Sequence, residues 1–198
     1  MLFRSIGAFA GEYTRKFDRV LRVATIYAIE PQPDRAAALA SLPLEHARLV
    51  VLNHALWDAA GEMSFRLNAH ASSASLLPVH PLQTESFPFV QETALITVPT
   101  ARLDDLVPDE ALRAPVLIKI DAQGAEDRII AGGARTFGSA AVVLIEMSYV
   151  PMYEGQPLFH AVHTLLSNLG FMFSGIKNQV THPSTGRPLF AHCIYTRS

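Results

Sequence analysis

Cysteine is almost absent from this sequence: among its 198 residues, Cys193 is the only one. A single thiol cannot form a disulfide within the chain, so nothing indicates an oxidising compartment. Cys193 lies in an apolar, strand-like stretch, where we expect it to belong to the core rather than to act as a nucleophile. These observations favour a cytoplasmic protein.

Long apolar runs are also missing. A helix that spans a bilayer needs about 20 apolar residues, whereas the longest runs here are short and strand-like, such as residues 140–145. Residues 1–11 carry a positive charge and small side chains, but Arg4 interrupts the apolar core that an export signal would need. We therefore expect neither a membrane span nor an export signal.

Positive charge is not in excess either. The formal net charge of −2 leaves no broad basic face for a phosphate backbone, so a nucleic acid is not the expected partner.

His160 and His163 lie three apart on an expected helix, but no further ligand at suitable spacing completes a metal shell. The serines at 72, 73 and 75 lack the Gly-x-Ser-x-Gly turn of many hydrolases.

The chain does contain regularly alternating elements. Its 198 residues are 49% hydrophobic, which fits a single domain that buries roughly 70% of the surface of the unfolded chain. Short β-rich runs alternate with helical patterns, and this predicts an α/β fold, a doubly wound, mostly parallel sheet with helices on both faces. We expect strands near residues 4–7, 24–29, 49–52, 62–67, 95–98, 116–120, 141–146, 171–176 and 190–195, and helices over 12–20, 34–40, 103–108, 126–132 and 159–169.

Two parts of this pattern are less regular. Residues 69–92 hold four serines, three prolines and two histidines without periodicity, which predicts a long mobile loop. The last two strands flank a polar loop with Pro183, Gly186 and Pro188, which predicts a closing hairpin with one reversed strand.

A glycine turn and an acid indicate a ligand site at the start of the fold. Gly7 to Gly11 separates a strand from a helix, where glycines let a ligand approach the backbone, although such turns are also common structural features. Glu30 follows the next strand, 19 residues beyond Gly11. An acid at about this spacing can accept hydrogen bonds from both ribose hydroxyls. Together they favour a nucleoside-bearing cofactor over a solvated acid before a proline.

A second group of polar residues surrounds the expected strand at 116–120. Lys119 lies inside this apolar strand and should pair with a carboxylate, for which Glu146 on a neighbouring strand is the candidate. Asp121 should face the cleft at the end of the strand. Glu126 lies in the first turn of the next helix, where the helix dipole favours an acid even without a catalytic role.

Two further segments could line the cleft. The loop after Glu146 holds Tyr149 and Tyr153, whose rings and hydroxyls could form part of a substrate pocket or simply a packed connection. His54 and His70 flank the expected cleft, and either imidazole could act as a general base near neutral pH.

Taken in order, these segments resemble the FkbM family of class I methyltransferases over nearly the whole chain. The stretch Ile118-Lys-Ile-Asp-Ala-Gln-Gly-Ala-Glu126 is the most specific. The other matching pieces are residues 6–13, 26–31, 53–58, 72–76, 103–105, 144–146 and 153–157.

The resemblance implies a Rossmann-like sheet of seven strands with one reversed, binding S-adenosylmethionine at the glycine turn. It implies methyl transfer to a hydroxyl of a saccharide or another small natural product. From the spacing of the histidines we expect no metal site. The implied cofactor contacts are Gly7, Ala8, Gly11, Glu30 with the ribose, Pro31, Asn53 and Asp58, and the implied acceptor contacts are Ser73, Tyr149 and Tyr153. For the base, Asp121 is the first candidate, followed by Glu126 and His54.

The glycine turn departs from the family pattern Asp-Val-Gly-Ala-Asn-x-Gly at two positions. Ser5 replaces the acid and Phe9 replaces the amide, and the turn follows only a few residues of a short or clipped first strand. The alternative hypothesis is therefore a diverged, weak or inactive homologue that binds a ligand or a partner. A nicotinamide-dependent reductase would need the fuller Gly-x-Gly-x-x-Gly turn, which is missing.

Overall fold

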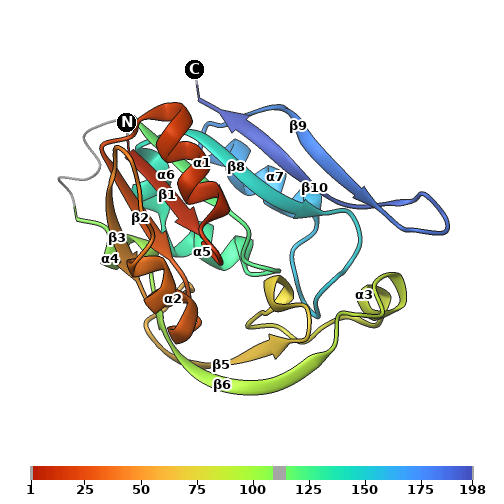
Figure 1. Ribbon diagram of the computed structural model, residues 1–198. Helices are drawn as coiled ribbons and strands as arrows, with labels where there is room; N and C mark the ends of the chain where they lie inside the picture. The colour runs from red at the N-terminus through yellow and green to blue at the C-terminus, as the bar shows by residue number, and fades with distance from the viewer. Residues whose placement is uncertain (1, 109–114, 198) are drawn as a thin grey trace.

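A computed structural model describes residues 2–108 and 115–197. Its centre is a seven-stranded sheet in the order β3-β2-β1-β7-β8-β10-β9 (Figure 1). Strand β10 runs antiparallel to both of its neighbours, and the other pairs are parallel. The predicted mostly parallel sheet with one reversed strand is therefore confirmed. The strands are β1 (Leu2–Ile6), β2 (Thr25–Ile29), β3 (Arg48–Leu52), β7 (Val116–Ile120), β8 (Ala140–Ser148), β9 (Met172–Thr181) and β10 (Pro188–Thr196).

Strand β1 lies in the middle of the sheet. Each of its five residues pairs with a residue of β2 on one side and of β7 on the other. The strand is therefore as long as both of its neighbours, although the sequence predicted a short one. This pairing holds the turn after Ile6 beside the end of β7.

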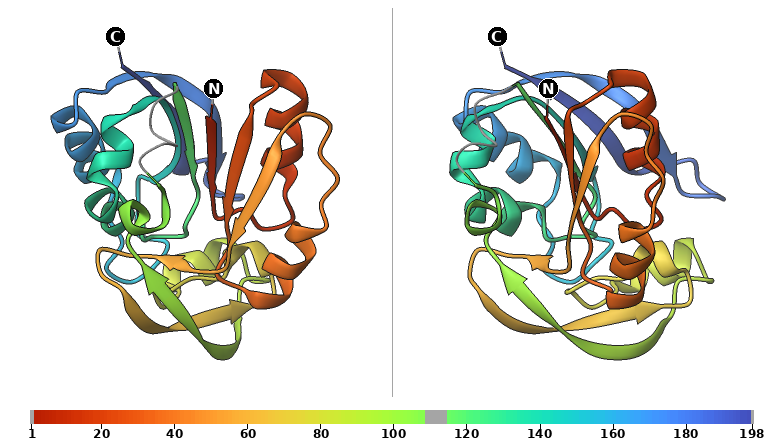
Figure 2. Two further views of the ribbon diagram at one scale, coloured as in Figure 1. Left: turned by 90° about the vertical axis from the view of Figure 1, so that its left-hand side faces the viewer. Right: turned by 60° about the vertical axis from the view of Figure 1, so that its left-hand side comes forward.

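Helices cover both faces of the sheet, as Figure 2 shows in its left view. One face carries α1 (Glu12–Leu21) and α2 (Pro33–Ala40), and the other carries α5 (Glu126–Gly132), α6 (Ala134–Gly138) and α7 (Phe159–Asn168) with the short α4 (Leu103–Leu106). Successive strand residues point to opposite faces, so Leu117 packs with Phe3 toward α1, whereas Ile118 and Ile120 join the larger core beneath α5 and α7. No helix of the described ranges is long and apolar enough to cross a membrane.

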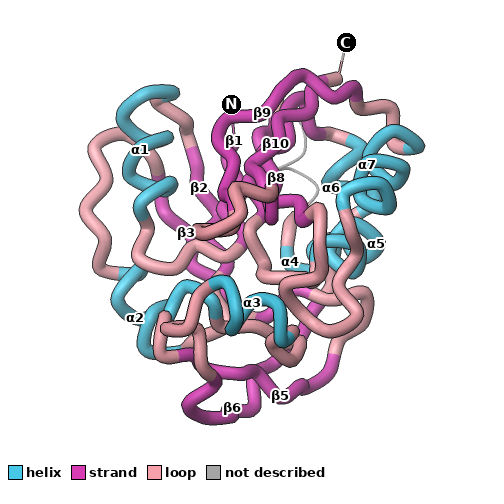
Figure 3. The backbone as a smooth tube through the Cα atoms, turned by 90° about the vertical axis from the view of Figure 1, so that its right-hand side faces the viewer, coloured by secondary structure: helices cyan, strands magenta, loops and turns pink. Residues whose placement is uncertain are grey.

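Between β3 and β7 the chain makes a long excursion that builds a second, three-stranded sheet. Its order is β4 (Ala55–Leu56), β6 (Glu92–Ala101), β5 (Gly61–Asn68). The curved pair β5 and β6 passes below the carboxyl ends of the central strands (Figures 1 and 3). The excursion therefore covers the edge of the sheet at which ligands bind in this fold class.

The prediction that residues 69–92 form a loop without regular structure was wrong. This segment contains a 3-10 turn, η1 (Ala71–Ser73), and helix α3 (Pro81–Ser86). The ring of His80 accepts a hydrogen bond from the Leu82 N–H at the start of α3, and Val79 pairs with Tyr153 across the fold. The sequence shows no periodicity here because the segment is held by these tertiary contacts, which have no fixed spacing along the chain.

Candidate functional site

The glycine turn after β1 lies directly against the end of β7. Gly7 has a positive φ of +66°, and a Cβ atom added there would overlap the carbonyl oxygen of Asp121. The Asp121 N–H donates to the carbonyl of Ile6 at 3.3 Å. Only glycine allows this approach, because it has no Cβ and adopts a positive φ without a steric penalty.

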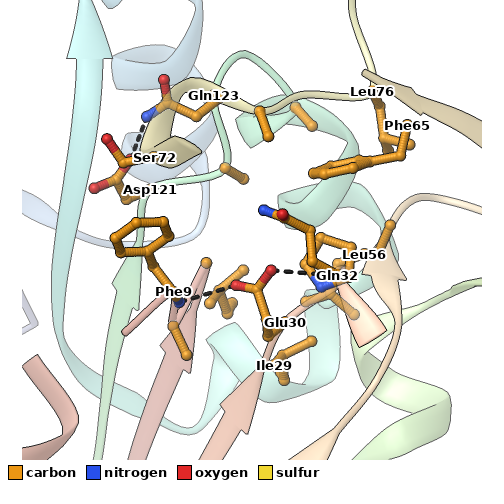
Figure 4. Close-up of a pocket in the computed structure, with 18 of the residues that line it drawn as sticks. Phe9, Ile29, Glu30, Gln32, Leu56, Phe65, Ser72, Leu76, Asp121 and Gln123 are labelled. Atoms are coloured by element: carbon orange, nitrogen blue, oxygen red, sulfur yellow. Dashed lines mark hydrogen bonds between the residues drawn. The ribbon is translucent and has the colours of Figure 1, made fainter. Parts of the chain in front are cut away.

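Glu30 joins this turn to the end of β2. Its Oε2 accepts the Phe9 N–H at 2.9 Å and its Oε1 accepts the Gln32 N–H at 3.1 Å, as the dashed lines in Figure 4 show. Asn53 fixes the same region from β3 by donating its side-chain amide to the carbonyl of Glu30 at 2.8 Å. Burial raises the pKa of Glu30, although both N–H donors favour its charged form.

A pocket of about 540 Å³ opens between these turns and the excursion. Of the predicted cofactor contacts, Gly7, Ala8, Glu30 and Pro31 line it, as do the candidate bases His54 and Asp121. Phe65 and Leu76 of the excursion form an apolar wall opposite Glu30 (Figure 4).

Three other predicted cofactor contacts lie outside the residues that line this pocket in the described chain: Gly11, Asn53 and Asp58. Asn53 acts on the pocket only through the turn that it holds. The carboxylate of Asp58 receives a hydrogen bond at 2.8 Å from Arg128 on α5. The sequence could not show that these three side chains lie outside the pocket lining, because spacing after a strand does not reveal the direction in which a side chain points.

Four charged or titratable side chains gather where β7, β8 and β10 meet, and two of them, Lys119 and Asp121, line this pocket. Lys119 donates to the carbonyl of Gly7 at 3.0 Å and lies 3.4 Å from Asp121 Oδ2. Its ion-pair partner is therefore Asp121, and the predicted pairing with Glu146 was wrong. The Nε2 atom of His192 lies 3.6 Å from Asp121 Oδ2 and 3.6 Å from Glu146 Oε2.

These surroundings give the carboxyl groups of Asp121 and Glu146 different acidities. Burial opposes the charge on Asp121, but the Lys119 ammonium and then the His192 ring hold its pKa well below the usual range. Burial and the negative charge of Asp121 both raise the pKa of Glu146 well above its ordinary value. Asp121 is thus a stable carboxylate, and Glu146 is the stronger base.

Gln123 connects the two acids. Its side-chain N–H group donates to Asp121 Oδ1 at 2.5 Å and to Glu146 Oε1 at 3.2 Å. Its Oε1 accepts the Tyr153 hydroxyl at 2.6 Å. The residue has a positive φ of +55°, which is uncommon for a side chain of this size and recurs at ligand sites.

A second pocket, of about 260 Å³, adjoins the first. The two share four lining residues, namely His70, Ser72, Asp121 and Gln123. Ser73 and Tyr153, both predicted as acceptor contacts, line the second pocket, as does Glu146. Tyr149 does not line either pocket of the described chain and stacks on Phe159, with ring centroids 5.5 Å apart.

Glu126, a candidate base, is buried at the start of α5. It is not among the described residues that line either pocket. Its Oε1 accepts the N–H groups of Ala122 at 3.2 Å and Gly124 at 3.3 Å. Burial raises its pKa to about 7. This geometry is that of an acid that holds the turn between β7 and α5.

Sequence reasoning missed His192 altogether. It lies opposite Glu146 in the antiparallel pairing of β10 with β8, a partnership between residues 46 positions apart. The alternation of β10 gave a usable signal, since His192 stands between Ala191 and Cys193, which are both fully buried on the opposite face.

A family model described as the methyltransferase FkbM domain matches residues 5–173 of this chain. The chain belongs to the FkbM family of methyltransferases. Among curated relatives, the 2-O-methyltransferase NoeI of Sinorhizobium fredii (strain NBRC 101917 / NGR234) is 30% identical over 171 residues. The match covers 81% of this chain and 69% of NoeI. The resemblance drawn from the sequence motifs is confirmed.

Solved structures share the fold of this FkbM chain at low sequence identity. Precorrin-6y C5,15-methyltransferase from Geobacter metallireducens GS-15 superposes with a TM-score of 0.50 at 13% identity, covering 100% of this chain and 80% of the other. Magnesium protoporphyrin IX methyltransferase from Synechocystis PCC 6803, solved with bound S-adenosylmethionine, gives 0.48 at 9% identity, with coverage of 100% and 70%. By family and by fold, the chain is an S-adenosylmethionine-dependent methyltransferase.

Proposed function

We propose that this FkbM chain transfers the methyl group of S-adenosylmethionine to a hydroxyl of a saccharide or another small natural product. The observation that carries the proposal is the meeting of two pockets at Asp121 and Gln123. A methyl transfer needs donor and acceptor side by side, because the acceptor oxygen must approach the sulfonium methyl in line with the bond that breaks. We assign the larger pocket to the cofactor and the smaller one to the acceptor.

The residues of the larger pocket fit the cofactor. Its volume of about 540 Å³ lies within the roughly 300–1,000 Å³ common for cofactor sites. Glu30 has lone pairs left for the ribose hydroxyls after accepting its two backbone N–H groups. Gly7 and Ala8 let the ligand approach the backbone, while Phe65 and Leu76 offer apolar surface to the base. When bound, the cofactor supplies a methyl group on a positively charged sulfur.

The smaller pocket suits a hydroxylated ring. Phe87, Phe89 and Phe190 offer flat apolar faces, while Gln83 and Glu146 offer polar groups. The curated relative NoeI is named a 2-O-methyltransferase, which supports oxygen as the atom that receives the methyl group here.

Calorimetry with S-adenosylmethionine and its demethylated product tests the cofactor assignment. Glu30→Ala should weaken binding at least tenfold, because the ribose hydroxyls lose their acceptor. Glu45→Ala is the matched control, since this exposed acid pairs with Arg19 outside the lining of the pocket. Equal affinities for wild type and Glu30→Ala would remove Glu30 from the site.

A transfer assay distinguishes an active enzyme from a diverged binding module. The departures from the family pattern at Ser5 and Phe9 favour the binding module. The assay follows radiolabelled methyl groups from S-adenosylmethionine to a panel of methyl glycosides and phenols. Labelling of at least one hydroxyl compound supports the enzyme. Tight cofactor binding without transfer to any member of the panel would favour the binding module.

A further inference from the structure

Resting on this function, we propose that Glu146, rather than Asp121, accepts the proton of the acceptor hydroxyl, and that His192 positions it. Glu146 lies on β8 with its carboxylate in the lining of the acceptor pocket. Among the described residues, Asp121 lines both pockets, whereas Glu146 lines the acceptor pocket alone. Glu146 therefore faces the side from which the hydroxyl would enter.

Asp121 is a weak proton acceptor because each of its carboxylate oxygens faces a donor or a cation. Oδ1 accepts the Gln123 amide at 2.5 Å, and Oδ2 faces Lys119 at 3.4 Å. A carboxylate paired with an ammonium in a buried site favours its charged form and binds protons weakly. We assign Asp121 a positioning role, holding Lys119 and Gln123 beside the junction of the pockets.

Glu146 is surrounded by groups of both signs from several elements. Asp121 after β7 and Glu126 on α5 add negative charge, which favours the protonated form of Glu146. Lys119 on β7 and the Gln123 amide favour its carboxylate. On the far side stand the Tyr153 hydroxyl and the His192 ring. Burial exceeds the favourable contacts, so the pKa of Glu146 lies well above that of an ordinary acid, and its carboxylate binds a proton more readily than that of Asp121.

His192 is held between the two acids without a hydrogen bond to either. Both of its ring nitrogens are buried and lack a hydrogen-bond partner among the residues that the structure describes. Its Nε2 is 3.6 Å from each carboxylate, slightly beyond hydrogen-bond distance. A small movement would bring the ring to Glu146, so the imidazole can orient that carboxylate and receive its proton.

The proposed step balances in atoms and charge. The acceptor oxygen forms a bond to the methyl carbon, the carbon–sulfur bond breaks with its electron pair left on sulfur, and the hydroxyl proton moves to Glu146 Oε2. The products are a methyl ether, a neutral thioether and a protonated Glu146. Its proton then passes to His192 Nε2, 3.6 Å away, and leaves to solvent.

The first test needs no acceptor. The full chain, labelled with ¹³C at the glutamate carboxyl carbon, is titrated by NMR with S-adenosylhomocysteine bound. We expect three glutamate signals, those of Glu30, Glu126 and Glu146, to titrate above the ordinary range, and Glu146→Gln should remove one of them. If Glu146→Gln removes no such signal, the proposal is overturned, whatever the fate of the proposed function.

The second test measures turnover with the first panel compound that wild type methylates. Glu146→Gln should lower kcat by about 10²–10³-fold with unchanged cofactor affinity, whereas Glu146→Asp should keep part of the activity. Glu62→Gln, an exposed acid on β5, is the matched control and should retain wild-type turnover. Melting curves confirm that each variant is folded. A Glu146→Gln variant within threefold of wild type would overturn the proposal.

The role of His192 has its own readout. His192→Asn removes the imidazole that receives the proton of Glu146, so kcat should fall while the KM for the acceptor and the cofactor affinity stay unchanged. A kcat equal to that of wild type, or a lower kcat accompanied by weaker binding of cofactor and acceptor, would mean that His192 is only structural. The ligand atoms of Asp121, Glu146 and His192 also lie within 4.8 Å of one another, close enough for one cation. Loss of turnover in EDTA with recovery in Mg²⁺ would therefore overturn the proton-acceptor role.

Discussion

The α-carbon of Gly7 lies so close to the carbonyl oxygen of Asp121 that a methyl group on residue 7 would overlap that oxygen. This contact joins the turn after β1 to the end of β7 in the wall of the larger pocket. It connects the end of the site that we assign to the cofactor with the charged cluster around Lys119, whose ammonium donates to the Gly7 carbonyl. The glycine is therefore required by the tertiary contact as well as by its φ angle.

Gly7→Ala should destabilise the fold and disrupt the cofactor pocket together. A positive φ costs an L-residue roughly 1–2 kcal/mol, and relieving the overlap adds a cost of similar size. We expect the free energy of unfolding to fall by about 2–4 kcal/mol and S-adenosylmethionine binding to be lost. Denaturant unfolding and calorimetry measure the two effects.

Gly138→Ala is the matched control for this substitution. Gly138 ends α6, and a Cβ atom added there would meet nothing within 4 Å. We expect unchanged binding and equal or slightly higher stability, because alanine is the better helix former. Normal binding by Gly7→Ala would show that the turn can move away from Asp121.

Phe9 adopts a positive φ of +48° in the same turn, at the position where the family pattern has asparagine. Asparagine tolerates this conformation, whereas β-branched residues are outliers in it. Phe9→Asn should therefore unfold with a free energy roughly 1–2 kcal/mol higher than Phe9→Val. Both variants lose the stacking of Arg35 on the Phe9 ring, so their difference isolates the backbone effect. Equal stabilities in urea would argue against strain at residue 9.

Glu126 should make stability depend on pH. Burial raises its pKa from 4.5 to about 7, so the folded chain binds a proton that the unfolded chain releases between these values. The contribution of Glu126 is therefore fully present below pH 4.5 and is lost as the pH rises to about 7, by roughly 3 kcal/mol.

Glu126→Gln should remove this pH dependence while keeping an oxygen that accepts the Ala122 and Gly124 N–H groups. The measurement is urea unfolding of both proteins from pH 4.5 to pH 8, with Glu62→Gln as an exposed control. The difference between wild type and Glu126→Gln should grow toward pH 8 in favour of the variant. A difference that stays constant with pH would mean that Glu126 keeps an ordinary pKa in the fold.

Tyr153 should fix the orientation of the Gln123 amide. Its hydroxyl donates to Gln123 Oε1, which leaves the amide nitrogen to face the carboxylates of Asp121 and Glu146. Tyr153→Phe removes this donor, so turnover should fall about tenfold, equivalent to one hydrogen bond of roughly 1.4 kcal/mol. Cofactor affinity measured by calorimetry should stay unchanged. Unaltered turnover would show that Asp121 and Glu146 orient the amide without Tyr153.

Much of the fold could be predicted because its signals are local. Buried strands such as residues 116–120 are apolar runs, helices such as residues 126–132 follow glycine or polar turns, and their alternation indicates a parallel sheet. The same holds for Gly7 and Glu30, whose positions after successive strands bring them to one edge of the sheet. The helix and turn within residues 69–92 escaped prediction because contacts to other segments hold them.

The sequence by itself determined the family, the layered sheet and the meeting of Gly7 and Glu30 at one edge of that sheet, because short motifs and periodicity encode backbone geometry within one strand and its following turn. Only the tertiary structure decided which partner Lys119 takes and that His192 stands beside Glu146. These relationships depend on strand register and on side-chain direction across the sheet. Alternation within β10 shows only that His192 faces away from Ala191 and Cys193. Which side chain His192 meets is set by the register of β10 against β8, and that register depends on the packing of residues far apart in the chain.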